Sequence, residues 1–214
     1  MTKKTTPTSL KKFTDCFYEH VPKEDLTGYS KEELQHIAKN VFEFSAQRHK
    51  NQFKINIYNP EKKKHGWNSY HTVIEVVNDN IPFLIDSLSA ALIKEKYRVF
   101  LLIHPLLKVT RTSSGRLEEV ENYKSSAQDK KTEAVVYIEL YEHLDTEEQH
   151  ALKKVLENVL TNVHLAVTDW RPMRNKIIDS IFDMEQGKRY FKEEEALEIQ
   201  AFLQWMDDGF FTFL

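Results

Sequence analysis

A polar corner near the middle of the chain offers the side chains best suited to hold a small ligand. Asn78, Asp79 and Asn80 follow a strand-like run, and Asp86 and Ser87 lie shortly after them. The N-terminus of a helix offers unpaired amides to a carboxylate, and the oxygens of Asp79 and Asn80 can accept hydrogen bonds from an ammonium group. This corner could therefore grip both charged ends of an amino acid. The same residues could instead only cap the helix.

Other chemistry is not indicated by the sequence. The glycines Gly28, Gly66, Gly115, Gly187 and Gly209 are isolated from one another, so no Gly-x-Gly-x-x-Gly turn or phosphate-cradling loop can be written. The nine histidines and one cysteine show no metal-ligand spacing, and no serine lies in a nucleophile elbow. We therefore predict no catalytic residue, no metal site and no NAD site within these 214 residues.

The corner is positioned by a predicted β-α-β unit. The run from Tyr70 to Val77 is rich in β-branched residues and alternates along two faces, as a strand requires. Pro82 suits the first turn of a helix because proline has no N–H to donate, and Asp79 or Asn80 can cap that turn. Apolar residues at helical spacing follow from Ile81 to Leu92, and a long apolar strand is predicted over Val99–Val109.

The remaining pattern completes an α+β fold. After a long polar connection, residues 134–141 form a third predicted strand, a helix begins at Asp145, and Val163, Leu165 and Val167 alternate as a short fourth strand. The order β-α-β-β-α-β predicts a ferredoxin-like sandwich with additional N-terminal and C-terminal helices. A capping box at Ser30 and Glu33 opens one of the N-terminal helices. The predicted domain ranges are 1–66, 67–169, 170–209 and 210–214, the last being the strand-like start of a further domain.

Both faces of the predicted sheet are too apolar to be left in water. One side collects Ile74, Val76, Val99, Leu101, Ile103, Val136 and Ile138, and the other collects Val73, Val77, Phe100, Leu102, Leu106, Val135, Tyr137 and Tyr141. A contiguous apolar patch of several hundred Å² marks an interface. The second face should be covered by the N-terminal segment, by the C-terminal helices or by another copy of the chain, and we predict a homo-oligomer through this face.

Composition excludes several classes of protein. The formal net charge of −3 gives no pull towards nucleic acid. The longest apolar run, Val99 to Leu107, is interrupted by His104 and Pro105 and falls short of the roughly 20 residues that span a bilayer. The first residues carry lysines with no apolar stretch behind them, unlike a signal peptide. We therefore expect a cytoplasmic protein with neither nucleic-acid nor membrane partners.

Several motifs resemble those of a known family. The run Asn78-Asp79-Asn80-Ile81-Pro82-Phe83-Leu84, with Ile103-His104-Pro105 after it, is similar to the N-terminal region of the large, bacterial-type NAD-specific glutamate dehydrogenases. Further similar runs are Phe17 to Leu26, Ile57 to Pro60, Asp169 to Met173 and Phe202 to Leu214. The resemblance covers nearly the whole chain, and the Asn-Asp-x-x-Pro-Phe-Leu and Phe-Thr-Phe-Leu runs are specific to it.

The resemblance implies a function for the chain. The family oxidises L-glutamate to 2-oxoglutarate and ammonia with NAD, in a catalytic domain that lies downstream of the similar region. That region resembles an ACT-type domain, a βαββαβ module that binds an amino-acid effector or pairs subunits. By this similarity Asp79, Asn80, Pro82 and Asp86 are the candidate effector-binding residues. A free-standing amino-acid-binding or adaptor module is the alternative.

The chain departs from the ACT pattern at one position. ACT ligand corners carry glycine just after the proline, where the effector approaches the backbone, and this chain has Phe83 there. The bulky ring shifts the expectation towards a subunit-contact or structural role.

Overall fold

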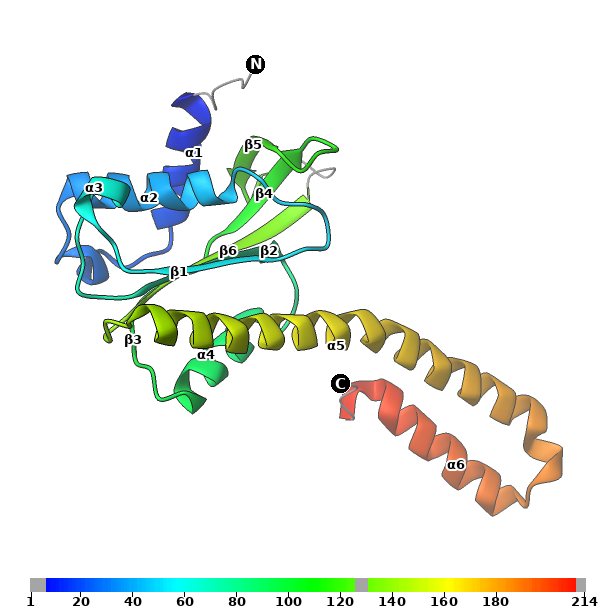
Figure 1. The fold of residues 1–214 in the computed structure, drawn as a ribbon. Coiled ribbons are helices and arrows are strands. Elements are labelled where there is room, and N and C mark those ends of the chain that lie inside the picture. The colour runs from blue at the N-terminus through cyan, green and yellow to red at the C-terminus, as the bar shows by residue number, and fades with distance from the viewer. Residues whose placement is uncertain (1–6, 126–130, 211–214) are drawn as a thin grey trace. The chain divides into compact units, whose positions relative to one another are not determined.

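The computed structural model describes residues 7–125 and 131–210 and divides the chain into two compact units, Met1–Leu160 and Thr161–Leu214 (Figure 1). The first unit is an antiparallel sheet with helices on both faces, and the second is helical. The predicted domain limits remain a prediction.

The described residues form nine helical segments and six strands. The helices are α1 (Pro7–Tyr18), η1 (Lys23–Leu26), α2 (Lys31–Ser45), α3 (Lys62–His65), α4 (Leu84–Lys94), α5 (Thr146–Gly187), η2 (Lys188–Tyr190), α6 (Glu193–Trp205) and η3 (Met206–Phe210). The strands are β1 (Lys54–Tyr58), β2 (Val73–Asp79), β3 (Val99–Ile103), β4 (Leu106–Arg111), β5 (Leu117–Asn122) and β6 (Lys131–Leu140).

The sheet has the ferredoxin-like layout that the sequence predicts, with one exchange. Its strand order is β1-β2-β6-β4-β5, with β3 also pairing β6, and every pairing is antiparallel. Along the chain, β2, α4, the strand pair β3 and β4, β6 and α5 follow one another. If β3 and β4 are counted as the one long strand that was predicted, these elements give the β-α-β-β-α part of the expected order. The edge place beside β2 is filled by β1, which comes earlier in the chain. The α+β ferredoxin-like fold class is thus confirmed.

The predicted fourth strand at Val163, Leu165 and Val167 is wrong. These residues lie inside α5, which runs unbroken for 42 residues and contains Pro172. The apolar stripe of α5 includes Leu152, Leu156 and Leu160, and Val163 continues it at helical spacing. Alternation over only five residues was therefore too short to separate a strand from a continuing helix.

The region from Val99 to Glu133 holds more structure than predicted. The long strand is interrupted at His104 and Pro105, so that β3 and β4 pair with different halves of β6. Pro105 has no backbone N–H to donate to a sheet, which accounts for a break here. The polar connection after Arg111 contains β5, which forms a hairpin with β4. Leu117 and Val120 anchor β5 because their side chains are buried.

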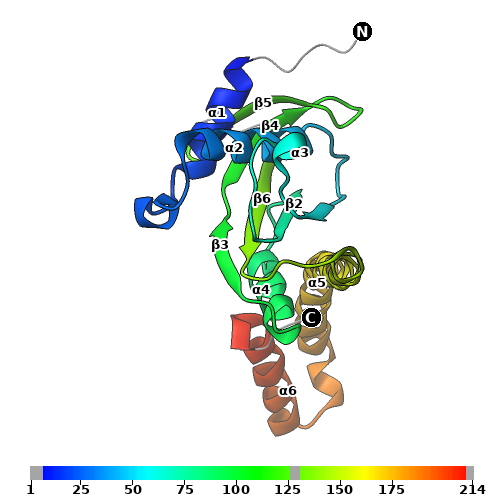
Figure 2. The same ribbon diagram turned by 60° about the vertical axis from the view of Figure 1, so that its left-hand side comes forward.

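Helices cover both faces of the sheet, as two views of the ribbon show (Figures 1 and 2). The face under α1 and α2 is built around Val73, Val77, Val135, Tyr137, Leu101 and Ile103. The face under α4 and α5 is built around Ile74, Val76, Val136 and Ile138, and their core cluster includes Leu156 of α5. The N-terminal segment thus covers the face that carries Val73 and Tyr137. Side chains of β3 and β4 lie opposite to our expectation: Leu101 and Ile103 pack under α1 and α2, and Leu102 and Leu106 under α4 and α5.

Of two helix starts predicted from the sequence, one is confirmed and one is wrong. The Ser30 capping box is confirmed: Glu33 N donates to Ser30 Oγ at 3.2 Å, and Ser30 N donates to Glu33 Oε2 at 2.8 Å. The predicted start of α4 at Ile81 or Pro82 is wrong, because the helix begins at Leu84 after Phe83 in a left-handed conformation with φ of 65°.

The second unit is a pair of helical segments. The C-terminal part of α5 ends at Gly187, the short turn η2 follows at Lys188–Tyr190, and α6 begins at Glu193. Arg174 Nε donates to Asp207 Oδ1 at 2.7 Å, which ties α5 to η3. The π-helical turn η3 extends to Phe210, the first residue of the predicted strand-like end, so the prediction is wrong at that residue. The remainder of the predicted strand-like end, residues 211–214, lies outside the described residues.

Candidate functional site

Asp79, one of the four predicted effector residues, lines a cavity. It ends β2, and its Oδ1 accepts a hydrogen bond from Arg48 Nη2 at 2.7 Å. Asn80 is exposed, and its backbone N–H donates to Thr132 O at 3.1 Å. Pro82 and Asp86 are exposed and do not line that cavity. Of the four predicted residues, Asp79 therefore lines this cavity, and Asn80, Pro82 and Asp86 do not.

Capping of α4 by Asp79 or Asn80 is not observed. Phe83 holds the N-cap position without any side-chain cap. A left-handed φ is unfavourable for a residue with a Cβ atom, by roughly 1 kcal/mol, and Phe83 is half exposed. The backbone at this position therefore has the conformation that glycine adopts most easily, although the side chain here is an aromatic ring.

The cavity beside Asp79 has a volume of about 390 Å³ and is lined mainly by polar side chains. Its walls come from the segment after α2, the end of β2, the β4–β5 hairpin and the start of β6. The lining residues are Arg48, Lys50, Asp79, Val109, Thr110, Arg111, Thr112, Ser113, Gly115, Lys131 and Glu133. In size it falls within the range of small-molecule sites.

Two arginines bind the two carboxylates that line the cavity. Arg48 Nη2 donates to Glu133 Oε1 at 2.6 Å as well as to Asp79, and its side chain is only 2% exposed. Arg111 binds Glu133 through two bonds of 2.8 Å, from Nε to Oε1 and from Nη2 to Oε2. Burial alone would lower the pKa of Arg48, but its hydrogen bonds to Glu133 and Asp79 outweigh this and raise it. Arg48 therefore stays charged.

Strand register places the two carboxylates side by side. Asp79 on β2 is the direct partner of Glu133 on β6, so their side chains leave the same face of the sheet. Two like charges across a strand pair destabilise the sheet unless a cation lies between them. Arg48 supplies that cation by bonding both of them.

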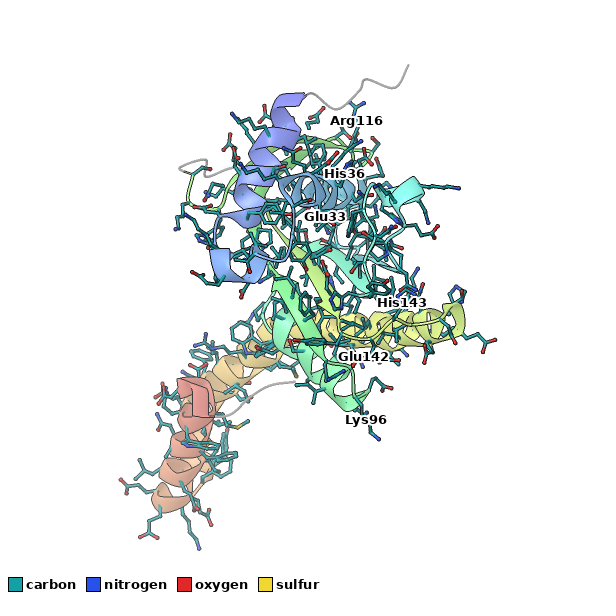
Figure 3. All side chains as sticks on the ribbon, turned by 90° about the vertical axis from the view of Figure 1, so that its left-hand side faces the viewer. Glu33, His36, Lys96, Arg116, Glu142 and His143 are labelled. Carbon is teal, nitrogen blue, oxygen red and sulfur yellow. The ribbon has the colours of Figure 1, made fainter. Side chains whose placement is uncertain are left out.

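The β4–β5 turn binds both arginines through one backbone carbonyl. Gly115 O accepts from Arg48 N and from Arg111 Nη1, both at 2.9 Å. Gly115 has φ of 84°, and a Cβ atom there would meet Arg48 O at 2.4 Å. The turn therefore requires glycine at position 115. Figure 3 shows Arg116, the next residue, at this end of the sheet, with Glu142 and His143 at the opposite end.

Sequence reasoning missed Arg48, Arg111 and Glu133. Arg48 lies in a polar segment without periodicity, and Arg111 and Glu133 stand at the ends of what was predicted to be a plain connection. The alternation of β6 carried a usable signal, since Glu133 shares a face with Val135 and Tyr137. A carboxylate on a buried face needs a buried partner.

A second pair of carboxyl groups lies on the same sheet face without arginines. Tyr58 Oη donates to Glu75 Oε1 at 3.0 Å, and Tyr137 Oη donates to Glu139 Oε1 at 2.6 Å. Burial raises the pKa of Glu75 from 4.5 to about 7, and burial also raises the pKa of Glu139. This pair is enclosed in the core below α1 and α2, so it suits proton binding better than ligand binding.

The described ranges show neither a metal-binding cluster nor a membrane-spanning helix. Residues 7–125 and 131–210 contain no group of three or more His, Cys, Asp or Glu side chains placed to hold a metal ion. Over the same ranges, none of the helices combines the length and the apolar character needed to cross a bilayer.

Comparison with known proteins identifies the family. The family model described as "Glutamate dehydrogenase, ACT1 domain" matches residues 13–156. The chain is 30% identical over 202 residues to the NAD-specific glutamate dehydrogenase of Pseudomonas aeruginosa, and 30% identical over 203 residues to that of Halomonas elongata. Each alignment covers 94% of the chain but only 12% and 13% of the respective relatives, so the chain spans about an eighth of their length. The resemblance found in the sequence is confirmed, and the chain belongs to the family of glutamate dehydrogenase ACT1 domains.

Proposed function

We propose that this chain is the non-catalytic N-terminal regulatory and subunit-contact module of an NAD-dependent glutamate dehydrogenase. The match of nearly the whole chain to a small part of two such enzymes carries this proposal. The complete enzyme would convert L-glutamate and NAD to 2-oxoglutarate and ammonia, with NAD bound outside this chain. An enzyme of this kind in amino-acid metabolism would work in the cytoplasm.

An assay of the complete enzyme tests the catalytic part of the proposal. The full reading frame that contains these residues should form NADH from NAD only when L-glutamate is present. The 214-residue chain alone should bind no NAD in a calorimetric titration. Saturable NAD binding by the chain alone, or a full-length protein without glutamate-dependent NADH formation, would overturn the proposal.

The regulatory part of the proposal centres on Asp79. We propose that an amino-acid effector binds at the Asp79 corner, with Asn80, Pro82 and Asp86 as the other candidate contacts from the sequence. The support is the cavity that Asp79 lines, together with the ACT1 family membership. An effector coupled to the active site would change its affinity for substrate by typically 5- to 150-fold. Substrate titrations of the full-length enzyme with and without single amino acids, repeated for Asp79→Ala, test this.

Association of copies also stays a proposal. The sheet face that we expected to pair is covered by α1 and α2 of the same chain, so contact between copies would use an outer surface. Sedimentation velocity over a range of concentrations measures the association state of the chain directly. A species of monomer mass at every concentration would contradict a subunit-contact role for these residues by themselves.

A further inference from the structure

The cavity beside Asp79 carries a surplus of positive charge. Four cationic side chains line it, Arg48, Lys50, Arg111 and Lys131, against the two carboxylates Asp79 and Glu133. The chain as a whole has a formal net charge of −3, so this concentration of cations is local and is not a consequence of composition. A concave site with an excess of one sign of charge focuses its field on ions of the opposite sign.

The two arginines are already engaged within the protein. Arg48 Nη1 donates to Gln52 O at 2.7 Å, and its Nη2 serves Asp79 and Glu133. Arg111 donates hydrogen bonds to Glu133, to Gly115 O and, at 2.9 Å, to Ser45 O. Their role is to shape the cavity and to neutralise its two carboxylates. The positive surplus therefore belongs to the lysines.

Lys50 and Lys131 are the cations left for a ligand. Both are exposed, and neither forms an ion pair with any residue in 7–125 or 131–210. They come from separate segments, the loop after α2 and the first residue of β6, where Lys131 pairs in register with Val109. Ser113 also lines the cavity, and a serine hydroxyl can donate to an oxyanion.

We propose that this cavity binds a small dianion, a dicarboxylate or a phosphate, held by Lys50 and Lys131. Two ammonium groups match two negative charges, whereas a zwitterionic amino acid offers one carboxylate and an ammonium group that the lysines repel. The volume of about 390 Å³ accommodates such a molecule with water. The inference rests on the proposed effector site for its position and replaces the amino acid with a dianion as ligand.

Titration calorimetry on the full 214-residue chain tests the inference. The probes are succinate, inorganic phosphate and L-alanine, each at the same ionic strength set with sodium chloride. Succinate or phosphate should bind and alanine should not. A lower Kd for succinate would identify the ligand as a dicarboxylate, and a lower Kd for phosphate would identify it as a phosphate. The Kd of the dianion should rise with added salt, because exposed charges are screened.

Charge-neutral variants separate this site from general attraction. The double variant Lys50→Gln with Lys131→Gln should raise the Kd of the dianion at least about tenfold. A matched control, Lys63→Gln with Lys64→Gln in α3, changes the net charge equally at exposed lysines outside the cavity and should leave the Kd unchanged. Circular dichroism of both variants should match the parent chain. An equal loss in both double variants would overturn the site.

Asp79→Asn distinguishes the dianion from the amino acid. Removing this carboxylate should tighten dianion binding a few fold, because one repelling charge is lost, while Arg48 keeps Glu133 as its partner. An amino acid that uses Asp79 to hold its ammonium group should bind more weakly to the same variant. Binding of alanine but not of dianions would overturn the dianion and keep the effector site. Failure of all three probes would overturn the cavity as a binding site, and NADH formation by the full-length enzyme would still test the proposed module independently.

Discussion

Two pairs of carboxyl groups lie on one face of the same sheet and have different partners. Asp79 and Glu133 face each other at one end of β2 and β6, and Glu75 and Glu139 lie further along the same two strands. Residues two apart on a strand leave the same face, so all four point below α1 and α2. The first pair is bound by arginines and borders a cavity, whereas the second pair is bound by tyrosine hydroxyls and is enclosed.

The difference shows that the partner of a buried carboxyl group decides what the group can do. Arg48 and Arg111 bring charge into the protein, so Glu133 is held as one member of an ion-pair network. Tyr58 and Tyr137 bring only neutral donors, and the cost of burying a charge is then reduced by binding a proton. The arginine-bound pair is accordingly suited to shaping a site for charged ligands. The tyrosine-bound pair makes the stability of the core depend on pH.

The largest expected effect comes from breaking the arginine-bound pair. Glu133→Gln removes one charge from the network and leaves Arg48 and Arg111 short of a partner at a position that is 2% exposed. Breaking a buried ion pair in this way costs about 3 to 5 kcal/mol. Urea unfolding of the variant and the parent chain measures the loss.

The exposed pair of Lys39 and Glu43 provides the control for this prediction. Its N···O distance is 3.8 Å on the surface of α2, and such a pair contributes about 0.3 to 0.5 kcal/mol. Glu43→Gln should therefore change the free energy of unfolding by less than about 1 kcal/mol. Equal losses in Glu133→Gln and Glu43→Gln would show that the buried network does not stabilise the sheet.

The next effect is a dependence on pH that belongs to Glu75. The unfolded chain holds this proton up to a pH of about 4.5, and the folded chain holds it up to about 7. The stabilisation from the bound proton is complete below pH 4.5 and is lost as the pH rises through 7. Between pH 5 and pH 8 this amounts to roughly 2 to 3 kcal/mol.

Glu75→Gln should remove that part of the pH dependence. Glutamine keeps an acceptor for Tyr58 and titrates at no pH in this range, so the variant should lose less stability than the parent chain between pH 5 and pH 8. Urea midpoints at both pH values measure the difference. The neighbouring ionisable groups on the packed strands are Lys54 and Tyr58 on β1 and Tyr137 and Glu139 on β6, and they are common to both proteins. Parallel pH profiles for the two proteins would contradict the assignment to Glu75.

The strands and the fold class could be predicted because their signals are local. Alternation identified β2 and β6, and the capping box identified the start of α2. Local signals failed where two structures fit the same residues: Val163 to Val167 alternate, yet they continue the stripe of α5. The place of β1 beside β2 could not be predicted, since strand pairing is a contact between distant segments.

The candidate site was predictable only in part for the same reason. Asp79 was identified because it stands at a strand end next to a turn. Its partner Arg48 is 31 residues away, and Glu133 is 85 residues from Arg48. Only the register between β2 and β6 brings these residues together. The sequence alone therefore indicated one carboxylate of the cavity but not the cations that give the cavity its charge.

The smallest effect tests the tyrosine-bound pair from the donor side. Tyr58→Phe removes the hydroxyl that donates to Glu75 Oε1 at 3.0 Å and leaves the ring in place. A neutral hydrogen bond contributes about 1 kcal/mol, and one to an ionised group about 1.5 to 3 kcal/mol. The loss should thus be about 1 kcal/mol at pH 5, where Glu75 is protonated, and about 2 kcal/mol at pH 8. The control Tyr70→Phe changes a side chain that is 89% exposed and should have no effect at either pH. A loss from Tyr58→Phe that is the same at both pH values would mean that Glu75 keeps one protonation state throughout, and the contrast with the arginine-bound pair would then not extend to pH.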